Sequence, residues 1–376
     1  MTILQIVSCR GWSSDAYWAA RATVELERAG HDVVLVCKRR SEARVVRRAR
    51  DLGVSRVETL ELASGIVPVA DALDLKRLVG RLPATRVLHV HRGKEHWLAA
   101  LANRLSRSPR PLVRTRHIVQ PIRPHALNRW LYRKATDAVV TVTEAIRRQY
   151  VAAELAPPQR VLALPGGVDV ARFHPFVDVA AARRALDAPA GEPLVGLVSG
   201  FRVMKGHLTA VDAARRLTAG GRRFRMVFIG RGALESDIRG AIGEAGLAER
   251  VAVAGFVPDL VASMAALDVA VYAAVESDGM SRVLFEYLAA GRPVVASRVG
   301  VVPEVLEDGR SGLLVAAGDP GALARGIGRL LDDASLRSEV GAAGARLVRS
   351  RFSSERVAGE LVEVYARLAG LARLTA

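Results

Sequence analysis

Residues 2–38 read TILQIVSCRGWSSDAYWAARATVELERAGHDVVLVCK, and this stretch decides the fold class. It contains an apolar run at 3–8, a segment with apolar residues at helical spacing at 16–29, and a second apolar run at 33–36. Gly30 follows the helical segment and suits the left-handed position that ends a helix. A strand, a helix and a second strand in this order form a βαβ unit, whose two strands are parallel.

The same alternation continues along the chain and restarts after the charged, proline-containing stretch at 184–193. Strands are predicted at 3–8, 33–36, 87–90, 112–115, 138–142, 161–164, 194–199, 225–229, 251–254, 269–272 and 293–296. Helices are predicted at 16–29, 207–219, 233–245, 283–290 and 354–372. We therefore expect an α/β protein of two Rossmann-like domains, 1–188 and 189–353. The C-terminal helix, within 354–376, is expected to pack back onto the N-terminal domain.

Composition excludes several protein classes. The chain has 376 residues, of which half are hydrophobic and a quarter charged, so it is neither disordered nor collagen-like. Cys9 and Cys37 each lie in an apolar run, which predicts two core residues and no disulfide framework. The N-terminus lacks the pattern of a signal peptide, and no stretch approaches the roughly 20 apolar residues that span a bilayer. We expect a cytoplasmic protein, soluble or peripheral on the inner face of the plasma membrane.

The net charge of +17 is concentrated in the first half, where residues 1–175 contain 30 Lys and Arg against 15 Asp and Glu. No acid lies between Glu95 and Asp137, and Trp130 and Tyr132 lie within this basic stretch. One explanation is an arginine-rich surface that favours solubility. The other is a surface facing an anionic partner, such as acidic lipid headgroups. Nucleic acid is not expected, because no zinc-finger spacing or ribonucleoprotein signature is present.

Three loops of the second half carry candidate chemistry, because ligands of open parallel sheets bind beyond the carboxyl ends of the strands. Residues 200–207, GFRVMKGH, combine glycines and cations in a way that suits a diphosphate. Residues 230–232, GRG, follow the next strand. Residues 276–286, ESDGMSRVLFE, form a polar turn that leads into a helix, on which Glu286 suits a ribose diol. Each loop alone also fits an ordinary solvated turn.

In their order, these motifs resemble those of the retaining GT-B nucleotide-sugar glycosyltransferases, in particular the family-4 group. PGGVDVARFHP at 165–175 looks like the family's P-N-G-V-D-x-x-x-F-x-P pattern, and KGH at 205–207 follows it. Asp278 and Glu286 form an acid-x7-Glu pair, and AGRPVVA at 290–296 closes the block. The resemblance implies two parallel sheets that face across a cleft, with donor on the C-terminal domain and acceptor on the N-terminal one.

The resemblance also assigns roles on the donor side. Arg202 and Lys205 would hold the diphosphate, Asp278 would touch sugar hydroxyls, and Glu286 would bind the ribose. The backbone from Gly279 to Ser281 would lie near the sugar or phosphate. The full set of donor-side candidates is Arg202, Lys205, Gly230, Phe256, Val257, Asp278, Gly279, Met280, Ser281 and Glu286, of which Phe256 and Val257 would flank the base.

On the acceptor side, the resemblance places His117 near the transferred sugar, and His117, Asp278 and Lys205 form the predicted catalytic set. The family usually has Glu where this chain has Asp278, so either Asp278 or Glu276 fills the first acidic role. The candidates for acceptor contacts are Gly11, Trp12, Ser13, Ser14, His91 and Arg116.

The reaction so predicted moves a sugar, with retention, from a nucleoside diphosphate to a lipid-linked or cell-envelope glycan, of which lipopolysaccharide is one type. No Asp-x-Asp pair is positioned for a divalent ion, so neither metal nor cofactor is expected, and cations would stabilise the leaving diphosphate. The expected partners are the nucleotide sugar, a glycan or glycolipid acceptor and an anionic membrane surface. Two other functions stay open, an epimerase or phosphorylase of the same fold and a non-catalytic polyanion-binding protein.

Overall fold

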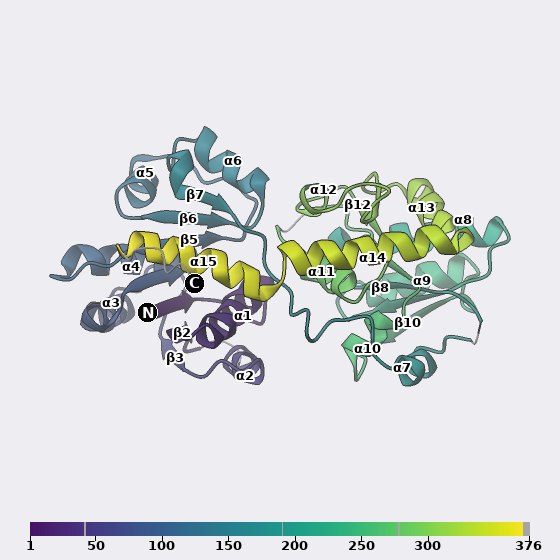
Figure 1. Ribbon diagram of the computed structural model, residues 1–376, viewed down its shortest axis with the longest axis horizontal. Coiled ribbons are helices and arrows are strands. Elements are labelled where there is room, and N and C mark those ends of the chain that lie inside the picture. Colours follow the sequence, from purple (N-terminus) through teal and green to yellow (C-terminus); the bar gives the residue numbers. More distant parts are fainter. Residues whose placement is uncertain (41–42, 190, 277–278, 371–376) are drawn as a thin grey trace. The chain divides into compact units, whose positions relative to one another are not determined.

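The computed structural model describes residues 1–40, 43–189, 191–276 and 279–370, and the chain divides into two compact units (Figure 1). The first unit contains Met1–Gly167 and the C-terminal helix, and the second contains Val168–Ser353. Residues 168–188, which we expected in the N-terminal domain, therefore pack with the second unit. The Val168 N–H donates to the Phe352 carbonyl at 3.0 Å, so the two segments that connect the units are bonded side by side.

The first unit has a parallel sheet, seven-stranded over the described residues, in the order β3-β2-β1-β4-β5-β6-β7. Its strands are β1 (Thr2–Val7), β2 (Asp32–Lys38), β3 (Val57–Leu60), β4 (Val87–Val90), β5 (Leu112–Arg116), β6 (Ala138–Thr141) and β7 (Val161–Ala163). Its helices are α1 (Ser14–Arg28), α2 (Ala43–Asp51), α3 (Pro68–Arg81), α4 (Gly93–Leu105), α5 (Ala126–Arg133), α6 (Glu144–Ala152) and α15 (Ser354–Leu368). The sequence analysis missed β3, an edge strand with one fully buried residue.

The second unit has a parallel sheet, six-stranded over the described residues, in the order β10-β9-β8-β11-β12-β13. Its strands are β8 (Leu194–Val198), β9 (Arg225–Ile229), β10 (Val251–Gly255), β11 (Val269–Tyr272), β12 (Val294–Ser297) and β13 (Leu313–Val315). Its helices are α7 (Ala180–Ala185), α8 (His207–Ala219), α9 (Glu235–Glu244), α10 (Leu260–Ala265), α11 (Arg282–Ala289), α12 (Val302–Val305), α13 (Pro320–Asp332) and α14 (Ala334–Arg351). The predicted α/β fold of two Rossmann-like sheets is confirmed.

Helix α15 packs against α1 of the first unit (Figure 1). At its start the Ser354 hydroxyl donates to the buried Glu25 carboxylate at 2.9 Å. Near its end the Tyr365 hydroxyl lies 2.5 Å from Nδ1 of His89, which belongs to β4, the strand that the candidate residue His91 follows. Among the described helices, none is long and apolar enough to cross a membrane. Cys9 and Cys37 are buried free thiols, as predicted.

In the second unit, the loop after β8 is held between its neighbours by backbone contacts too close for a side chain. A Cβ placed on Gly206, whose φ is +72°, would lie 1.9 Å from the Ala273 carbonyl oxygen, which follows β11. A Cβ on Gly230, at the end of β9, would lie 1.9 Å from the carbonyl oxygen of Ser199. Glycine at these two positions therefore lets the carboxyl ends of β9, β8 and β11 pack together.

We predict that Gly206→Ala destabilises the protein more than Gly221→Ala. The two glycines have nearly the same φ, +72° and +73°, but a Cβ on Gly221 would meet nothing within 4 Å. Gly221→Ala should cost about 1–2 kcal/mol of unfolding free energy through the left-handed backbone alone. The clash with Ala273 should add roughly 1–3 kcal/mol. Urea unfolding followed by circular dichroism measures both, and equal losses would contradict the close contact.

Candidate functional site

The predicted donor residues of the second unit follow four strands that are neighbours in the sheet. The order β10-β9-β8-β11 brings together Phe256 after β10, Gly230 after β9, the 199–206 loop after β8 and the residues that lead to α11. Backbone contacts connect these loops, because the Val275 N–H donates to the Met204 carbonyl at 2.9 Å. The carboxyl edge of this sheet therefore forms one continuous site.

At the β10 end, an exposed aromatic ring and a cation lie together. Phe256 is 70% exposed, and the Arg231 guanidinium carbon lies 5.3 Å from its ring centroid. The neighbouring Val257 is buried. An exposed ring supported by a cation offers a flat surface on which a nucleobase can stack.

At the β11 end, helix α11 presents Glu286. This carboxylate is buried and forms an ion pair with Arg282 Nε at 2.9 Å. Burial raises the pKa of Glu286, while the positive charges of Arg282 and Arg172 oppose the rise. The next residue, Tyr287, accepts the N–H of Val198 at the end of β8 with a distance of 2.6 Å, which fixes α11 against the central strand.

The start of this loop is partly outside the described residues. Asp278, predicted to touch the sugar and to act in catalysis, lies there together with Ser277. Gly279, Met280 and Ser281 are described and buried, and Ser281 is the N-cap of α11 without a side-chain capping bond. The segment from Gly279 to Ser281 therefore lies directly before the N-terminus of α11, and its predicted contact with sugar or phosphate stays a prediction.

In the first unit, the candidate residues lie at the carboxyl ends of β1, β4 and β5, which are neighbours in the sheet. The 8–13 loop follows β1, His91 follows β4 and His117 follows β5. Glu95 on α4 joins two of these ends, because its carboxylate accepts the N–H of Ser8 at 3.1 Å and that of Arg92 at 2.7 Å.

A chain of hydrogen bonds fixes the tautomers of His91 and His117. The Thr23 hydroxyl donates to the Ala19 carbonyl at 2.9 Å, so its oxygen accepts the Gln5 amide N–H at 3.2 Å. The Gln5 amide oxygen then accepts His91 Nε2–H at 3.0 Å. His91 Nδ1 is left to accept His117 Nε2–H at 3.1 Å. The lone pair of His117 therefore lies on Nδ1.

Burial keeps these histidines uncharged. It lowers the pKa of His117 to about 3, against the opposing effect of Asp15, and the buried Arg114 lowers it further. Burial likewise lowers the pKa of His91 well below its usual value. The edge of Trp18 packs on both rings, with centroid distances of 5.4 Å and 5.6 Å. A neutral His117 can accept a hydroxyl proton in a hydrogen bond but carries no positive charge of its own at neutral pH.

Asp15, at the start of α1, connects His117 with a neighbouring pocket. Its carboxylate accepts the Ser13 hydroxyl, and it accepts Arg92 Nε at 2.5 Å. Burial raises the pKa of Asp15, but His117 and the Arg92 guanidinium outweigh this effect and hold the pKa below its usual range. Asp15 is therefore a buried, charged group between the two regions.

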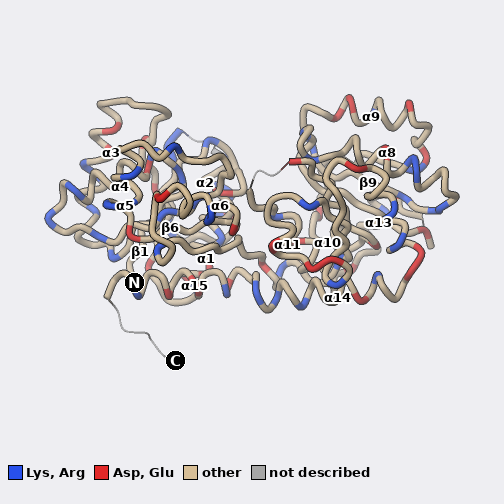
Figure 2. The backbone as a smooth tube through the Cα atoms, turned by 90° about the horizontal axis from the view of Figure 1, so that it is seen from above, with Lys and Arg blue, Asp and Glu red and all other residues tan. Residues whose placement is uncertain are grey.

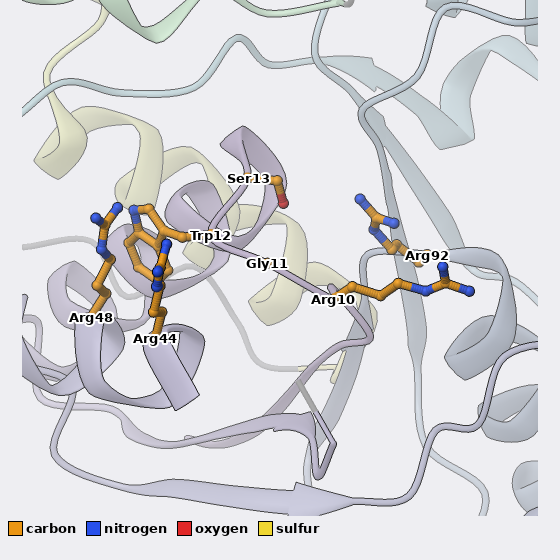
Figure 3. A pocket seen from close by; sticks show the side chains of 7 residues that line it. All are labelled: Arg10, Gly11, Trp12, Ser13, Arg44, Arg48 and Arg92. Atoms are coloured by element: carbon orange, nitrogen blue, oxygen red, sulfur yellow. The ribbon is translucent and has the colours of Figure 1, made fainter. Parts of the chain in front are cut away.

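The pocket has a volume of about 420 Å³ and is lined by residues from three neighbouring segments (Figure 3). Arg44 and Arg48 on α2 lie beside the ring of Trp12, and Arg10 and Arg92 lie across Gly11 from them (Figure 3). The seven described residues that line it are Arg10, Gly11, Trp12, Ser13, Arg44, Arg48 and Arg92.

Two other predicted acceptor residues, Ser14 and Arg116, do not line this pocket. The Arg116 guanidinium donates to the Gln120 carbonyl at 2.6 Å, on the loop that follows β5. Ser14 is exposed and begins α1. Within the described part of the chain, no three His, Cys, Asp or Glu side chains are grouped so that they could hold a metal ion.

Comparison with known proteins identifies the family. The model of "Glycosyltransferase Family 4" matches residues 18–172, and that of "Glycosyl transferases group 1" matches residues 192–333. The lipopolysaccharide core biosynthesis mannosyltransferase LpcC of Rhizobium leguminosarum bv. viciae is 30% identical over 324 residues, 84% of this chain and 89% of LpcC. The chain therefore belongs to the glycosyltransferase family that these two models and LpcC represent.

Other relatives of this glycosyltransferase align over less of their own length. The 2-deoxystreptamine glucosyltransferase of Streptomyces kanamyceticus is 34% identical over 66% of this chain, which spans 65% of that protein. The D-inositol 3-phosphate glycosyltransferase of Acidothermus cellulolyticus is 33% identical over 74% of this chain, which spans 66% of that protein.

Solved structures show that this family member has the GT-B fold. A glycosyltransferase from Rickettsia africae superposes with a TM-score of 0.85 at 19% identity, covering 98% of each chain. Anabaena HepE in complex with UDP superposes with a TM-score of 0.83 at 19% identity, covering 98% of this chain and all of HepE.

Several residues of the candidate site were not singled out in the sequence. Gln5 alternates with apolar residues in a strand, and Asp15 looks like an ordinary acid at a helix start. Arg92 directly follows the apolar run that ends in HVH at 89–91, and its place after a strand was the one available signal. Arg44 and Arg48 look like the exposed face of a basic helix.

We predict that Gln5→Leu lets His117 adopt both neutral tautomers, whereas the native protein holds it in the one protonated at Nε2. Leucine removes the amide oxygen that accepts from His91 Nε2, so the proton can move to His91 Nδ1 and reverse the bond to His117. Long-range ¹H–¹⁵N spectra of histidine-labelled protein should then show His117 protonated at Nδ1 in part of the population. The loss of the buried bond should cost about 1–3 kcal/mol of unfolding free energy.

Two controls accompany this experiment. Gln5→Glu keeps an acceptor oxygen at the same position and should keep the native tautomers. His96, whose Nε2 bonds to Thr136 at 2.8 Å, should not change in either variant. A His117 that stays protonated at Nε2 in Gln5→Leu would contradict the hydrogen-bond chain.

Proposed function

We propose that this protein transfers a sugar, with retention, from a nucleoside diphosphate sugar to a lipid-linked or cell-envelope glycan acceptor. The observation that carries the proposal is that Phe256, Gly230, Lys205 and Glu286 follow four strands, β10, β9, β8 and β11, that are neighbours in the sheet of the second unit. A flat ring suits the base, a close backbone and a cation suit the phosphates, and a carboxylate suits the ribose hydroxyls of such a donor. Anabaena HepE, which shares the fold, has been solved with UDP and with UDP-glucose.

The chemistry of the step follows from where charge develops. Cleavage of the anomeric bond places negative charge on the leaving diphosphate, and Arg202, Lys205 and the α11 N-terminus would stabilise it. No metal enters this proposal. The departing phosphate would accept the proton of the acceptor hydroxyl on the same face, which gives retention without a second carboxylate.

His117 would orient a hydroxyl group during this step. Its Nδ1 lone pair can accept a hydrogen bond from the sugar or the acceptor, and its neutral ring adds no charge that would oppose a developing cation at the anomeric carbon.

The acceptor class is inferred from two observations. LpcC, a lipopolysaccharide core mannosyltransferase by name, aligns over most of both chains. The first unit also carries basic residues along α4 and α5 (Figure 2). On these two helices the rings of Trp97 and Trp130 stack with their centroids 5.9 Å apart. Leu105 and Leu127 are 65% and 64% exposed there. Arginine, tryptophan and exposed leucine suit the interface of an anionic membrane, which supports a location at the inner face of the plasma membrane.

We predict that Lys205→Ala and Glu286→Ala abolish most donor turnover. Hydrolysis of a panel of UDP-, GDP- and ADP-sugars identifies the best donor. On it, loss of the Lys205 charge should lower kcat by about 100-fold, as removal of one electrostatic contact to a leaving group does. Loss of the Glu286 contacts should raise KM by roughly tenfold or more.

The matched control is Arg310→Ala. Arg310 is an exposed side chain that precedes β13, at the opposite edge of the same sheet. It should retain full turnover. Full turnover in Lys205→Ala and Glu286→Ala would overturn the donor site, and conversion of the donor to an epimer, or its cleavage by inorganic phosphate, would favour the epimerase or phosphorylase alternative. Salt-dependent binding to polyanions without nucleotide-sugar affinity would favour the binding protein.

We also predict that the α4–α5 surface binds anionic vesicles. The protein should partition onto phosphatidylglycerol-containing vesicles more than onto phosphatidylcholine vesicles, and the difference should shrink as salt rises. The double variant Arg104→Glu, Lys134→Glu should lose this preference. The same charge change on α14, Arg346→Glu with Arg349→Glu, should retain more of it. Equal partition onto both vesicles at low salt would exclude the membrane surface.

A further inference from the structure

The arginine pocket of the first unit gathers positive charge that the donor proposal does not use. Four of its seven described lining residues are arginines, and none of the seven is an acid. Arg92 shares the charge of Asp15, and Arg10 donates to the neutral Ser64 hydroxyl at 3.1 Å. The guanidinium groups form two pairs, Arg44 with Arg48 beside Trp12 and Arg10 with Arg92 across Gly11, and this positive charge attracts anions to the pocket (Figure 3).

The surroundings of the pocket add to this positive field. Lys38 also donates to Ser64, at 3.0 Å, so a lysine lies next to Arg10 on the pocket's rim. A second pocket of about 590 Å³ shares Arg10 and is lined by Lys38 and Arg40 among others. Val67 lines this second pocket, and the neighbouring Ile66 is 90% exposed.

The pocket is also built to hold a ring beside its charges. Trp12 packs on the core of the first unit and lies 6.3 Å from Tyr17 in an edge-on arrangement, so its ring is fixed. The ring faces Arg44 and Arg48 (Figure 3). A planar surface next to guanidinium groups suits a cyclic polyol that carries an anionic group.

Finally, the pocket adjoins the predicted acceptor-side histidine. Ser13 lines the pocket and donates to Asp15 at the start of α1, and Trp18 on the same helix packs against the His117 ring at 5.6 Å. The pocket and His117 therefore both adjoin the first turns of α1.

We propose that this pocket binds a phosphate group carried by the acceptor and so positions the acceptor hydroxyl at His117. This inference rests on the proposed function, because the bound molecule is an acceptor only if the protein transfers a sugar to it. The guanidinium fork matches phosphate oxygens in bidentate contacts, and a phosphomonoester carries nearly two negative charges at neutral pH. The phosphate can belong to a free sugar phosphate or to a lipid headgroup, since the exposed apolar residues beside the second pocket could hold a chain.

The test measures binding of defined probes to the full-length protein by calorimetry, in a low-salt buffer free of phosphate. Glucose 6-phosphate and dihexanoyl phosphatidic acid, the latter below its micelle concentration, represent the two sources. Glucose and dihexanoyl phosphatidylcholine are their controls. At least one phosphate probe should bind more tightly than its control by about tenfold or more.

The double variant Arg44→Gln, Arg48→Gln should weaken that binding by about tenfold or more. Arg47→Gln is the matched control, because Arg47 is exposed on the same helix but does not line the pocket, and it should bind as the native protein does. If both probes fail to exceed their controls, or if Arg47→Gln and the double variant weaken binding equally, the proposal is overturned.

Binding of UDP and of the best donor nucleotide to the same variants separates this proposal from the previous one. The double variant should bind the nucleotide with unchanged affinity. Loss of nucleotide affinity with unchanged phosphate-probe affinity would assign the arginines to the donor and overturn an acceptor pocket. Phosphate-probe binding that depends on Arg44 and Arg48 in a protein without nucleotide affinity would leave the pocket standing as an anion site and reject the donor assignment.

Discussion

Parallel pairing of neighbouring strands is the constraint on which both candidate sites depend. In the first unit β1 pairs with β2 on one side and β4 on the other, and β4 pairs with β5. All these strands end at one edge, so residues more than a hundred positions apart, such as Gln5 and His117, enter one hydrogen-bond chain. An antiparallel partner for β4 would place His91 at the opposite edge, and neither the chain nor the pocket could form.

Burial then decides the chemical state of what the strands bring together. Arg114 on β5 is buried, and its charge acts with desolvation to keep His89, His91 and His117 neutral. In the hydrogen bond between two neutral histidines, one ring donates its N–H and the other accepts it. Gln5 determines that His117 donates and His91 accepts. The charged group of the region is Asp15, which Arg92 and Ser13 stabilise. The first unit thus contains three chemically distinct groups: the uncharged Nδ1 of His117, the Asp15 carboxylate and the arginines of the pocket.

The fold and the strand ends could be predicted from the sequence, because apolar runs alternate with amphipathic helices in nearly every βαβ unit of the chain. It missed β3 and β13, which lie at sheet edges or have three residues, too short or too exposed for an apolar run. Lys205, Glu286 and His117 could be named from motifs. Gln5, Asp15 and Arg92 could not, because their importance comes from contacts with residues 77 to 102 positions away.

The arginines show the same difference between local pattern and spatial assembly. The acid-free stretch between Glu95 and Asp137 correctly drew attention to a basic surface, since Arg104 and Lys134 are exposed around Trp130. None of the four pocket arginines lies in that stretch. Arg10 and Arg92 follow strands, and Arg44 and Arg48 lie on α2, the helix that follows β2. A run of charged residues in the sequence therefore predicts a charged surface. A charged site in this fold, by contrast, forms where the ends of neighbouring strands converge.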